Sequence, residues 1–158
     1  MYWNYFKYVV KHKWCVFKIC LRRGMFIHAF THDLSKFFPS EFIPYAKKFY
    51  GSKSMNTLEK LYVKEDFKIA LIHHYNRNKH HIGYWLDCSG EPHNMPRRYA
   101  KQLAVDWQAM SLAKYKSYKY AKTDAIDFFK EKRSNMKMTP MTEYYIKYYL
   151  GIPEEEPE

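Results

Sequence analysis

The chain has 158 residues, the size of one domain and enough to bury a core without disulfides or a structural metal. Apolar residues make up 47% of it, which excludes wholesale disorder. The formal net charge of +11 favours anionic partners such as phosphates, nucleotides, nucleic acid or anionic lipid, although a solvated lysine surface also explains it.

Apolar residues recur at helical spacing in segment after segment, and the alternation typical of strands is missing. Glycine and proline punctuate the chain at the expected helix ends. The spacing predicts helices over residues 3–22, 26–37, 39–51, 57–77, 96–118, 123–133 and 139–151. The glycines and prolines between residues 78 and 96 predict an irregular loop.

These elements predict an all-α fold, a single compact helical bundle over residues 1–152 with an acidic tail over residues 153–158. The N-terminal segment contains too many lysines for a transmembrane span or a signal peptide. The three cysteines form no CxxC pair and indicate reduced thiols, so we expect the protein in the cytoplasm. The oligomeric state stays open.

Two predicted helices carry a polar residue on an otherwise apolar face. In the first helix, His12 lies in the stripe of Tyr5, Val9, His12, Val16 and Ile19. In the fifth, Asp106 lies in the stripe of Tyr99, Leu103, Asp106, Met110 and Ala113. A lone histidine on such a face is usually a satisfied core residue, but burying an ionised carboxylate is costly unless it is paired, hydrogen-bonded or bound to a metal.

Further histidines gather in two short segments. His32 and Asp33 offer an imidazole nitrogen and a carboxylate oxygen to one cation, although Asp33 also suits a helix start. The run HHYNRNKHH begins with His73-His74 and ends with His80-His81. Mixed imidazole and carboxylate ligands suit one or two divalent transition ions such as Mn, Fe, Co, Ni or Zn, with Mg possible. Lys36 follows His32-Asp33 closely, and Arg77 and Lys79 lie inside the histidine run, so these three cations are placed in sequence to offer positive charge to a phosphate.

The ordered set of His12, His32-Asp33, His73-His74 and Asp106 resembles the HD-domain superfamily of metal-dependent phosphohydrolases. HDLSK (32–36) is similar to the HDxGK form of its cyclic-dinucleotide phosphodiesterase branch, with Ser35 in place of glycine. KHKWCVFKIC, THDLSKFFPSEFIPY and HHYNRNKHHIGYW together resemble a small family from phages and bacteria that has no assigned activity. If the gene belongs to a phage, the host cytoplasm is the expected location.

The resemblance implies an HD-like helical bundle with His12, His32, Asp33 and Asp106 as the core metal ligands. His73 and His74 would bind a second ion or orient the substrate, and His80 or His81 can replace either of them. It also implies catalytic roles for Asp33 and Lys36, and substrate contacts from the set Lys36, Arg77, Lys79 and His81.

The leading hypothesis is therefore hydrolysis of a nucleotide or cyclic-nucleotide phosphate ester by metal-activated water. The alternative is a non-catalytic nucleotide or nucleic-acid binding protein, in which the tyrosines and lysines of residues 115–120 stack on bases and neutralise phosphates. Oxidation by an iron pair on the same fold and membrane-surface binding through the first helix are weaker options.

Overall fold

The computed structural model describes residues 1–51 and 55–153, and the acidic end of the predicted tail, residues 154–158, lies outside it. Within these residues the chain forms α-helices and 3₁₀ turns, and its one β-type contact is an isolated bridge between Leu86 and Pro92. The α-helices are α1 (Tyr2–Arg22), α2 (Phe26–Thr31), α3 (Pro39–Tyr50), α4 (Thr57–Arg77), α5 (Arg97–Tyr115), α6 (Tyr118–Lys132) and α7 (Pro140–Leu150). The 3₁₀ turns are η1 (Leu34–Phe37), η2 (Ile82–Trp85) and η3 (Arg133–Asn135). The predicted all-α class is confirmed.

Local sequence explains most of the helix ends. Asn56 and Glu59 form a reciprocal capping box at the start of α4, with bonds of 2.9 and 2.8 Å. Thr139 caps α7 by accepting from the backbone N–H of Thr142, and Pro140 occupies its first turn. Gly151 ends α7 with a φ of 74°, a left-handed conformation that glycine adopts without steric cost.

Three of the predicted helix boundaries are wrong. The expected helix over 26–37 is broken at His32-Asp33, and the helix expected to run to Tyr118 ends at Tyr115 because Lys116 adopts a left-handed conformation. The next helix begins at Tyr118, earlier than the expected start at residue 123 or 124. Neither break contains glycine or proline, so the usual punctuation does not signal it.

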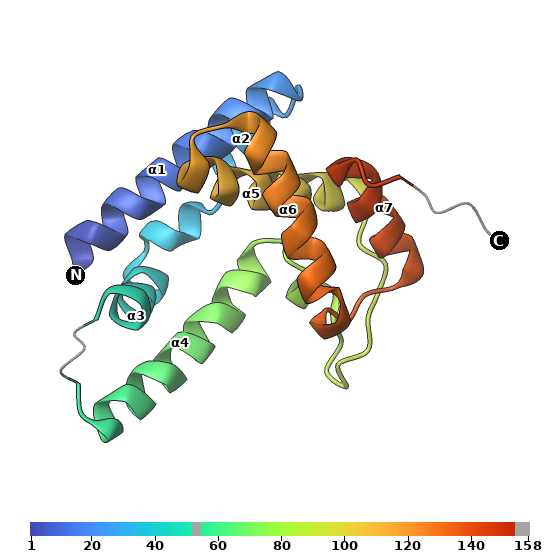
Figure 1. The fold of residues 1–158 in the computed structure, drawn as a ribbon. Helices are drawn as coiled ribbons and strands as arrows, with labels where there is room; N and C mark the ends of the chain where they lie inside the picture. Colours follow the sequence, from blue (N-terminus) through green and yellow to red (C-terminus); the bar gives the residue numbers. More distant parts are fainter. Residues whose placement is uncertain (52–54, 154–158) are drawn as a thin grey trace.

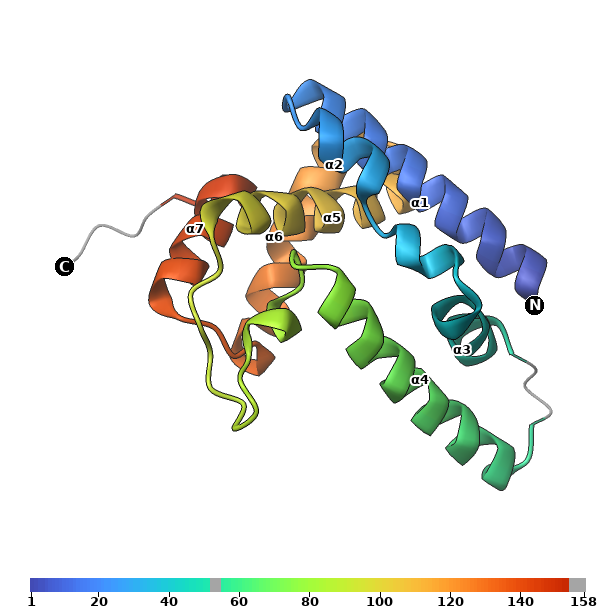
Figure 2. The same ribbon diagram turned by 180° about the vertical axis from the view of Figure 1, so that it is seen from behind.

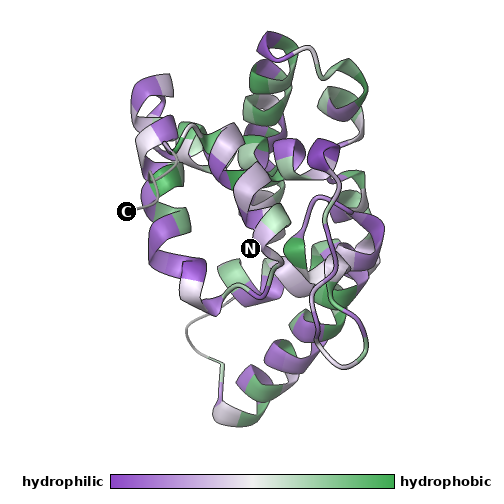
Figure 3. Cartoon of the chain, turned by 90° about the vertical axis from the view of Figure 1, so that its right-hand side faces the viewer, coloured by the Kyte–Doolittle hydropathy of each residue, from purple (hydrophilic) through white to green (hydrophobic). Residues whose placement is uncertain are grey.

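α5 is the central helix of the fold and contacts α1, α6 and α7 (Figure 1). It is buried on nearly all sides, and its alanines, which include Ala100, Ala104, Ala109 and Ala113, let the neighbouring helices approach closely. The start of α1, with α3 and α4, lies near one end of the molecule, and α6 and α7 lie near the other (Figures 1 and 2). Polar and apolar residues alternate along the helices (Figure 3), as expected where each helix buries one face.

Three apolar clusters surround the place where the polar residues meet. One joins α1, α2, α5 and the start of α6, a second joins α5, α6 and α7, and the third joins α1, α3 and α4. The stripe predicted on the first helix is buried throughout, whereas in the fifth helix Met110 is exposed and the rest of the predicted stripe is buried or half-buried. None of the described helices is both long and apolar enough to cross a membrane.

Gly83 lies in η2, directly beside the ring of Tyr75, and a Cβ on Gly83 would overlap that ring. We expect Gly83→Ala to lower the free energy of unfolding by about 1–3 kcal/mol, because an aromatic ring cannot yield as a flexible chain does. Urea denaturation measures the effect. In a Tyr75→Ala background, Gly83→Ala should lower the free energy of unfolding much less, because the aromatic ring that it would overlap has been removed. Wild-type stability for Gly83→Ala in the native background would contradict this packing.

Candidate metal centre

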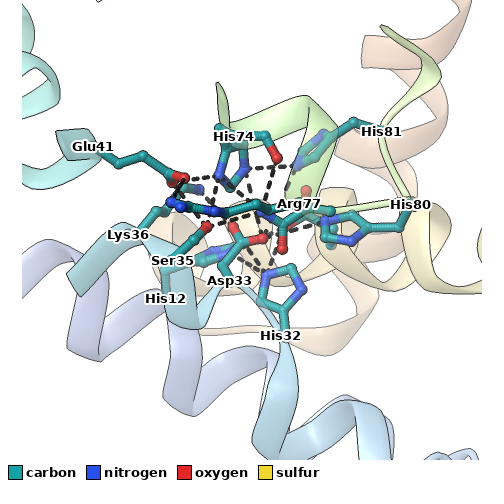
Figure 4. A network of polar contacts seen from close by, with 12 residues as sticks. His12, His32, Asp33, Ser35, Lys36, Glu41, His74, Arg77, His80 and His81 are labelled. Carbon is teal, nitrogen blue, oxygen red and sulfur yellow. Dashed lines mark hydrogen bonds and ion pairs between the residues drawn. The ribbon is translucent and has the colours of Figure 1, made fainter. Parts of the chain in front are cut away.

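Histidines and aspartates from four separate parts of the chain converge on one buried cluster (Figure 4). His12 comes from the middle of α1, and Asp106 comes from the middle of α5. His32 and Asp33 come from the junction between α2 and η1. The last part, His74 with His80 and His81, comes from the end of α4 and the loop after it.

The first set of ligand atoms is His12 Nε2, His32 Nε2, Asp33 Oδ2 and Asp106 Oδ1. His12 Nε2 lies 2.9 Å from Asp106 Oδ1 and 3.3 Å from His32 Nε2. His32 Nε2 lies 3.4 Å from both Asp33 Oδ2 and Asp106 Oδ1. Ligands with bonds of about 2.1 Å to one ion are separated by about 3.0 Å in an octahedron and about 3.4 Å in a tetrahedron. The atoms are therefore spaced as ligands of a single transition ion would be.

The break between α2 and η1 allows His32 and Asp33 to serve the same site. Adjacent residues on a continuous helix diverge by about 100°, which would send these two side chains apart. Here Asp33 has a φ of 50° and a ψ of 32°, the left-handed region that aspartate enters more readily than most residues. A strained backbone at a ligand residue is the kind of feature that gathers at functional sites.

A second set of imidazoles faces the other oxygen of Asp33. Asp33 Oδ1 lies 3.4 Å from His80 Nε2, 3.6 Å from His74 Nε2 and 4.0 Å from His81 Nε2. His74 Nε2 and His81 Nε2 are themselves 2.9 Å apart. The Asp33 carboxylate thus stands between two sets of nitrogen ligands, as a carboxylate that bridges two ions would.

Glu41 orients His74 from the side away from the cluster. Its carboxylate is fully buried, and Oε2 lies 2.8 Å from His74 Nδ1 and accepts a bond of 2.9 Å from the hydroxyl of Ser35. A neutral His74 that donates from Nδ1 to Glu41 keeps its lone pair on Nε2, toward Asp33. By contrast, Nδ1 of both His12 and His32 is buried and has no hydrogen bond to any residue that the structure describes.

The charges of the cluster suit a cation. Burial would raise the pKa of Asp33 and of Asp106, but His32 and Lys36 beside Asp33, and His12 with His32 beside Asp106, outweigh burial and hold both pKa values well below the usual range. Burial lowers the pKa of His81 to about 4 and that of His80 well below its usual value. Near neutral pH both aspartates are therefore charged, and the imidazoles of His80 and His81 are neutral, which are the forms that bind metal.

Several buried polar atoms of the cluster have no hydrogen-bond partner among the described residues. They are both carboxylate oxygens of Asp33, Oδ1 of Asp106 and Nε2 of His80. Two of these oxygens take part in ion pairs, Asp33 Oδ2 with Lys36 Nζ at 2.6 Å and Asp106 Oδ1 with His12 Nε2 at 2.9 Å. Buried acceptors without donors are costly, and a bound cation would satisfy them together. The residues present therefore fit a divalent ion.

The structure brings most of the predicted metal ligands together, but not His73. Its side chain is 38% exposed and lies 3.3 Å from Glu41 Oε1, outside the cluster. Of the predicted substrate contacts, Lys36 and His81 lie at the cluster. Arg77 Nη1 lies 3.0 Å from His73 Nδ1 and 3.7 Å from Glu41 Oε1, and Lys79 lies over the Tyr84 ring. The prediction thus named two cations whose side chains are engaged elsewhere.

Sequence reasoning assigned no role to His28 or Glu41 and gave His80 only as a substitute ligand, but the structure places all three at the site. His28 forms a buried group with His32 and His80 whose nitrogens all lie within 4.8 Å of one another. In the sequence, His28 stands four residues before His32, about one helical turn away. His80 belongs to the second histidine pair of the run HHYNRNKHH, which could replace His73-His74. Glu41 gave no signal, because a glutamate in the first turn of a helix is normal at an exposed position.

The fold and the site define an all-helical protein with a buried imidazole and carboxylate cluster. The chain belongs to a family of unknown function, DUF5662, whose model matches residues 1–152. No curated protein and no solved structure matches it. The family match gives no link to the HD-domain superfamily, so that resemblance stays a prediction and the function has to be argued from the chemistry of the cluster.

The pKa shifts of the cluster predict that the metal-free protein loses stability in acid. His28 and His81 have folded pKa values of about 4, whereas an unfolded histidine titrates near 6.5. Between these values the unfolded chain binds more protons, so the free energy of unfolding falls as the pH drops from about 6.5 to about 4. The lowered pKa values of Asp33 and Asp106 extend the loss to still lower pH.

Urea denaturation in the presence of a chelator at pH 7.5, 6 and 5 measures this dependence. His28→Gln should flatten it, whereas His93→Gln, which alters an exposed histidine of the loop, should leave the wild-type dependence unchanged. Equal stability of the wild type at pH 7.5 and pH 5 would contradict the prediction.

Proposed function

We propose that this protein binds one or two divalent transition-metal ions at the His/Asp cluster and hydrolyses a phosphate ester of a nucleotide or cyclic nucleotide. The observation that carries the proposal is the position of Asp33, whose Oδ2 faces His32 at 3.4 Å while Oδ1 faces His80 at 3.4 Å. On this proposal the bundle is HD-like, and the protein works in the cytoplasm.

Two groups of residues would hold the ions. His12, His32, Asp33 and Asp106 form the first group, and Asp33, His74 and His81 form the second. A divalent ion bound there supplies Lewis acidity for activating water and polarising a phosphoryl group. Imidazole and carboxylate ligands favour Mn, Fe, Co, Ni or Zn over Ca, with Mg as a weaker candidate.

Lys36 is the cation best placed to meet a phosphate. Its side chain is 16% exposed, pairs with Asp33 and lines the cavity above the cluster. Burial would lower the pKa of Lys36, but Asp33 and Asp106 raise it above its usual value, so the ammonium stays charged. An ammonium at this position would orient the phosphate and balance the charge that develops during hydrolysis.

The non-catalytic alternative is supported by the aromatic and basic turn between α5 and α6. Tyr120 is 63% exposed, and the Arg22 guanidinium lies 3.8 Å from the centre of the Tyr118 ring. Salt and chelator separate the two functions. Binding of nucleic acid through this turn should weaken steeply as salt rises and should not respond to a chelator.

The first test is metal content and metal-dependent hydrolysis. We expect the purified chain to bind one or two ions of Mn, Co or Zn, measured by elemental analysis and calorimetry, and to hydrolyse nucleotide esters with Mn, Co or Mg. His32→Ala and Asp106→Asn should abolish both, because each removes a ligand of the first group. Asp87→Asn, on an exposed loop, is the matched control.

Circular dichroism shows whether each variant is folded. If the wild type binds none of these ions, and His32→Ala and Asp106→Asn change nothing, the proposal is wrong.

The second test concerns Glu41 as a positioning residue. Glu41→Gln keeps the size of the side chain but removes the charge that orients His74, so we expect metal affinity to fall about 10- to 100-fold. Glu65→Gln removes an exposed carboxylate of α4 that pairs with Lys68 and should leave affinity unchanged. Calorimetric titration with Mn or Zn measures both. Wild-type affinity in Glu41→Gln would show that His74 does not depend on Glu41.

A further inference from the structure

A cavity of about 530 Å³ opens directly above the cluster. Its floor is formed by His12, Lys36, His81 and Asp106, residues of the proposed metal and phosphate site. Its walls are mostly aromatic: Tyr5, Tyr8, Tyr45, Phe49 and Tyr50, with Met110 at one side. The volume lies in the usual range for a small-molecule site, and an apolar wall with a few polar groups on the floor is the usual composition of one.

The wall rings lie close to one another around Tyr5. Its ring centre is 6.2 Å from that of Tyr45 and 6.1 Å from that of Tyr50. The ring centres of Tyr50 and Tyr8 are 6.5 Å apart, and Tyr50 is 36% exposed. An aromatic wall of this kind favours a ligand that contains a flat ring, such as a nucleobase, because any of the bases can stack on an aromatic side chain.

The Tyr5 hydroxyl adds a polar contact to the wall. The residue is 1% exposed, and its Oη has no hydrogen-bond partner among the described residues. Burial raises the pKa of Tyr5 above its usual value, so the phenol keeps its proton and can donate it. A buried donor without an acceptor is costly, and a ligand with a ring nitrogen or an oxygen at this level would satisfy it.

The charge on the floor limits how many phosphates the cavity can hold. Among the described residues that line it, from residues 1–51 and 55–153, Lys36 is the single lysine or arginine, and its ammonium already lies 2.6 Å from Asp33 Oδ2. Asp106 adds a negative charge to the same floor. A triphosphate carries three or more negative charges and is normally bound by several cations and backbone N–H groups. The lining that the structure describes contains no comparable group of cations.

We propose that this cavity selects a nucleotide with a single phosphate group, its base stacked against the aromatic wall and its phosphate at Lys36, and that it discriminates against nucleoside triphosphates. The inference rests on the proposed function for the position of the phosphate. It adds to that function a substrate class and names Tyr5 and Tyr50 as residues that determine specificity.

Calorimetry on the full chain with added Mn tests the inference through binding alone. The probes are the monophosphates AMP, GMP, CMP and UMP, the triphosphate ATP, and ribose 5-phosphate, which has a phosphate but no base. We expect at least one monophosphate to bind about tenfold more tightly than both ATP and ribose 5-phosphate, the lower end of what base stacking provides.

Substitutions at Tyr50 test the wall. Tyr50→Ala should weaken binding of the preferred monophosphate about tenfold and leave the affinity for ribose 5-phosphate unchanged. Tyr50→Phe keeps the ring and should bind the monophosphate as tightly as the wild type does. Tyr62→Ala, on the exposed face of α4, is the matched control and should bind as the wild type does. In a hydrolysis assay Tyr50→Ala should raise KM and leave kcat near the wild-type value.

The outcomes separate this inference from the proposed function. If the metal binds but ATP binds as tightly as every monophosphate, or Tyr50→Ala has no effect, the inference is overturned and the metal centre stands. If no hydrolysis occurs but monophosphates bind selectively and depend on the ring of Tyr50, the inference holds in a protein that binds without catalysis. If no probe binds, the inference is overturned.

Discussion

The buried negative charge of Asp33 and Asp106 is the constraint on which the rest of this structure depends. Both carboxylates lie inside the helical bundle, 3% and 4% exposed, where an ionised group without partners is strongly unfavourable. The fold surrounds them with imidazoles from α1, from the α2–η1 junction and from the end of α4 with the loop after it, and with the ammonium of Lys36. Removing one member of such a buried set is far more damaging than removing an exposed ion pair, because the remaining charge loses its compensation.

This constraint explains local features that would otherwise seem unrelated. The chain leaves the helical conformation at Asp33 so that two neighbouring side chains reach one point. α1 and α5 approach closely, so that His12 and Asp106 meet at 2.9 Å. Glu41 is itself a buried charge, held by Ser35 and His74, and it stabilises the second set of imidazoles from behind. Each buried charge therefore requires further polar residues around it, which explains why the network extends beyond the ligands.

Much of the fold could be predicted from sequence, because helical spacing and end signals are local properties. His12 and Asp106 could be found as polar residues in an apolar stripe. Periodicity did not distinguish His73 from His74, because α4 carries apolar residues on its exposed side as well, such as Ile69 and Ile72. The burial of Glu41 and the left-handed backbone at Asp33 and Lys116 depend on tertiary contacts, and no local pattern encodes them.

The distribution of charge also changes how the net charge of +11 should be interpreted. The sequence suggested that abundant lysine and arginine would attract a phosphate to the site, but Arg77 and Lys79 interact elsewhere, and the cavity floor has one ammonium facing two aspartates. The ammonium closest to the cluster is therefore already paired with Asp33, and the charge of the more distant surface is largely screened by salt. On this account affinity for phosphate depends on prior cation binding, and the aromatic wall supplies the binding energy that the basic surface does not.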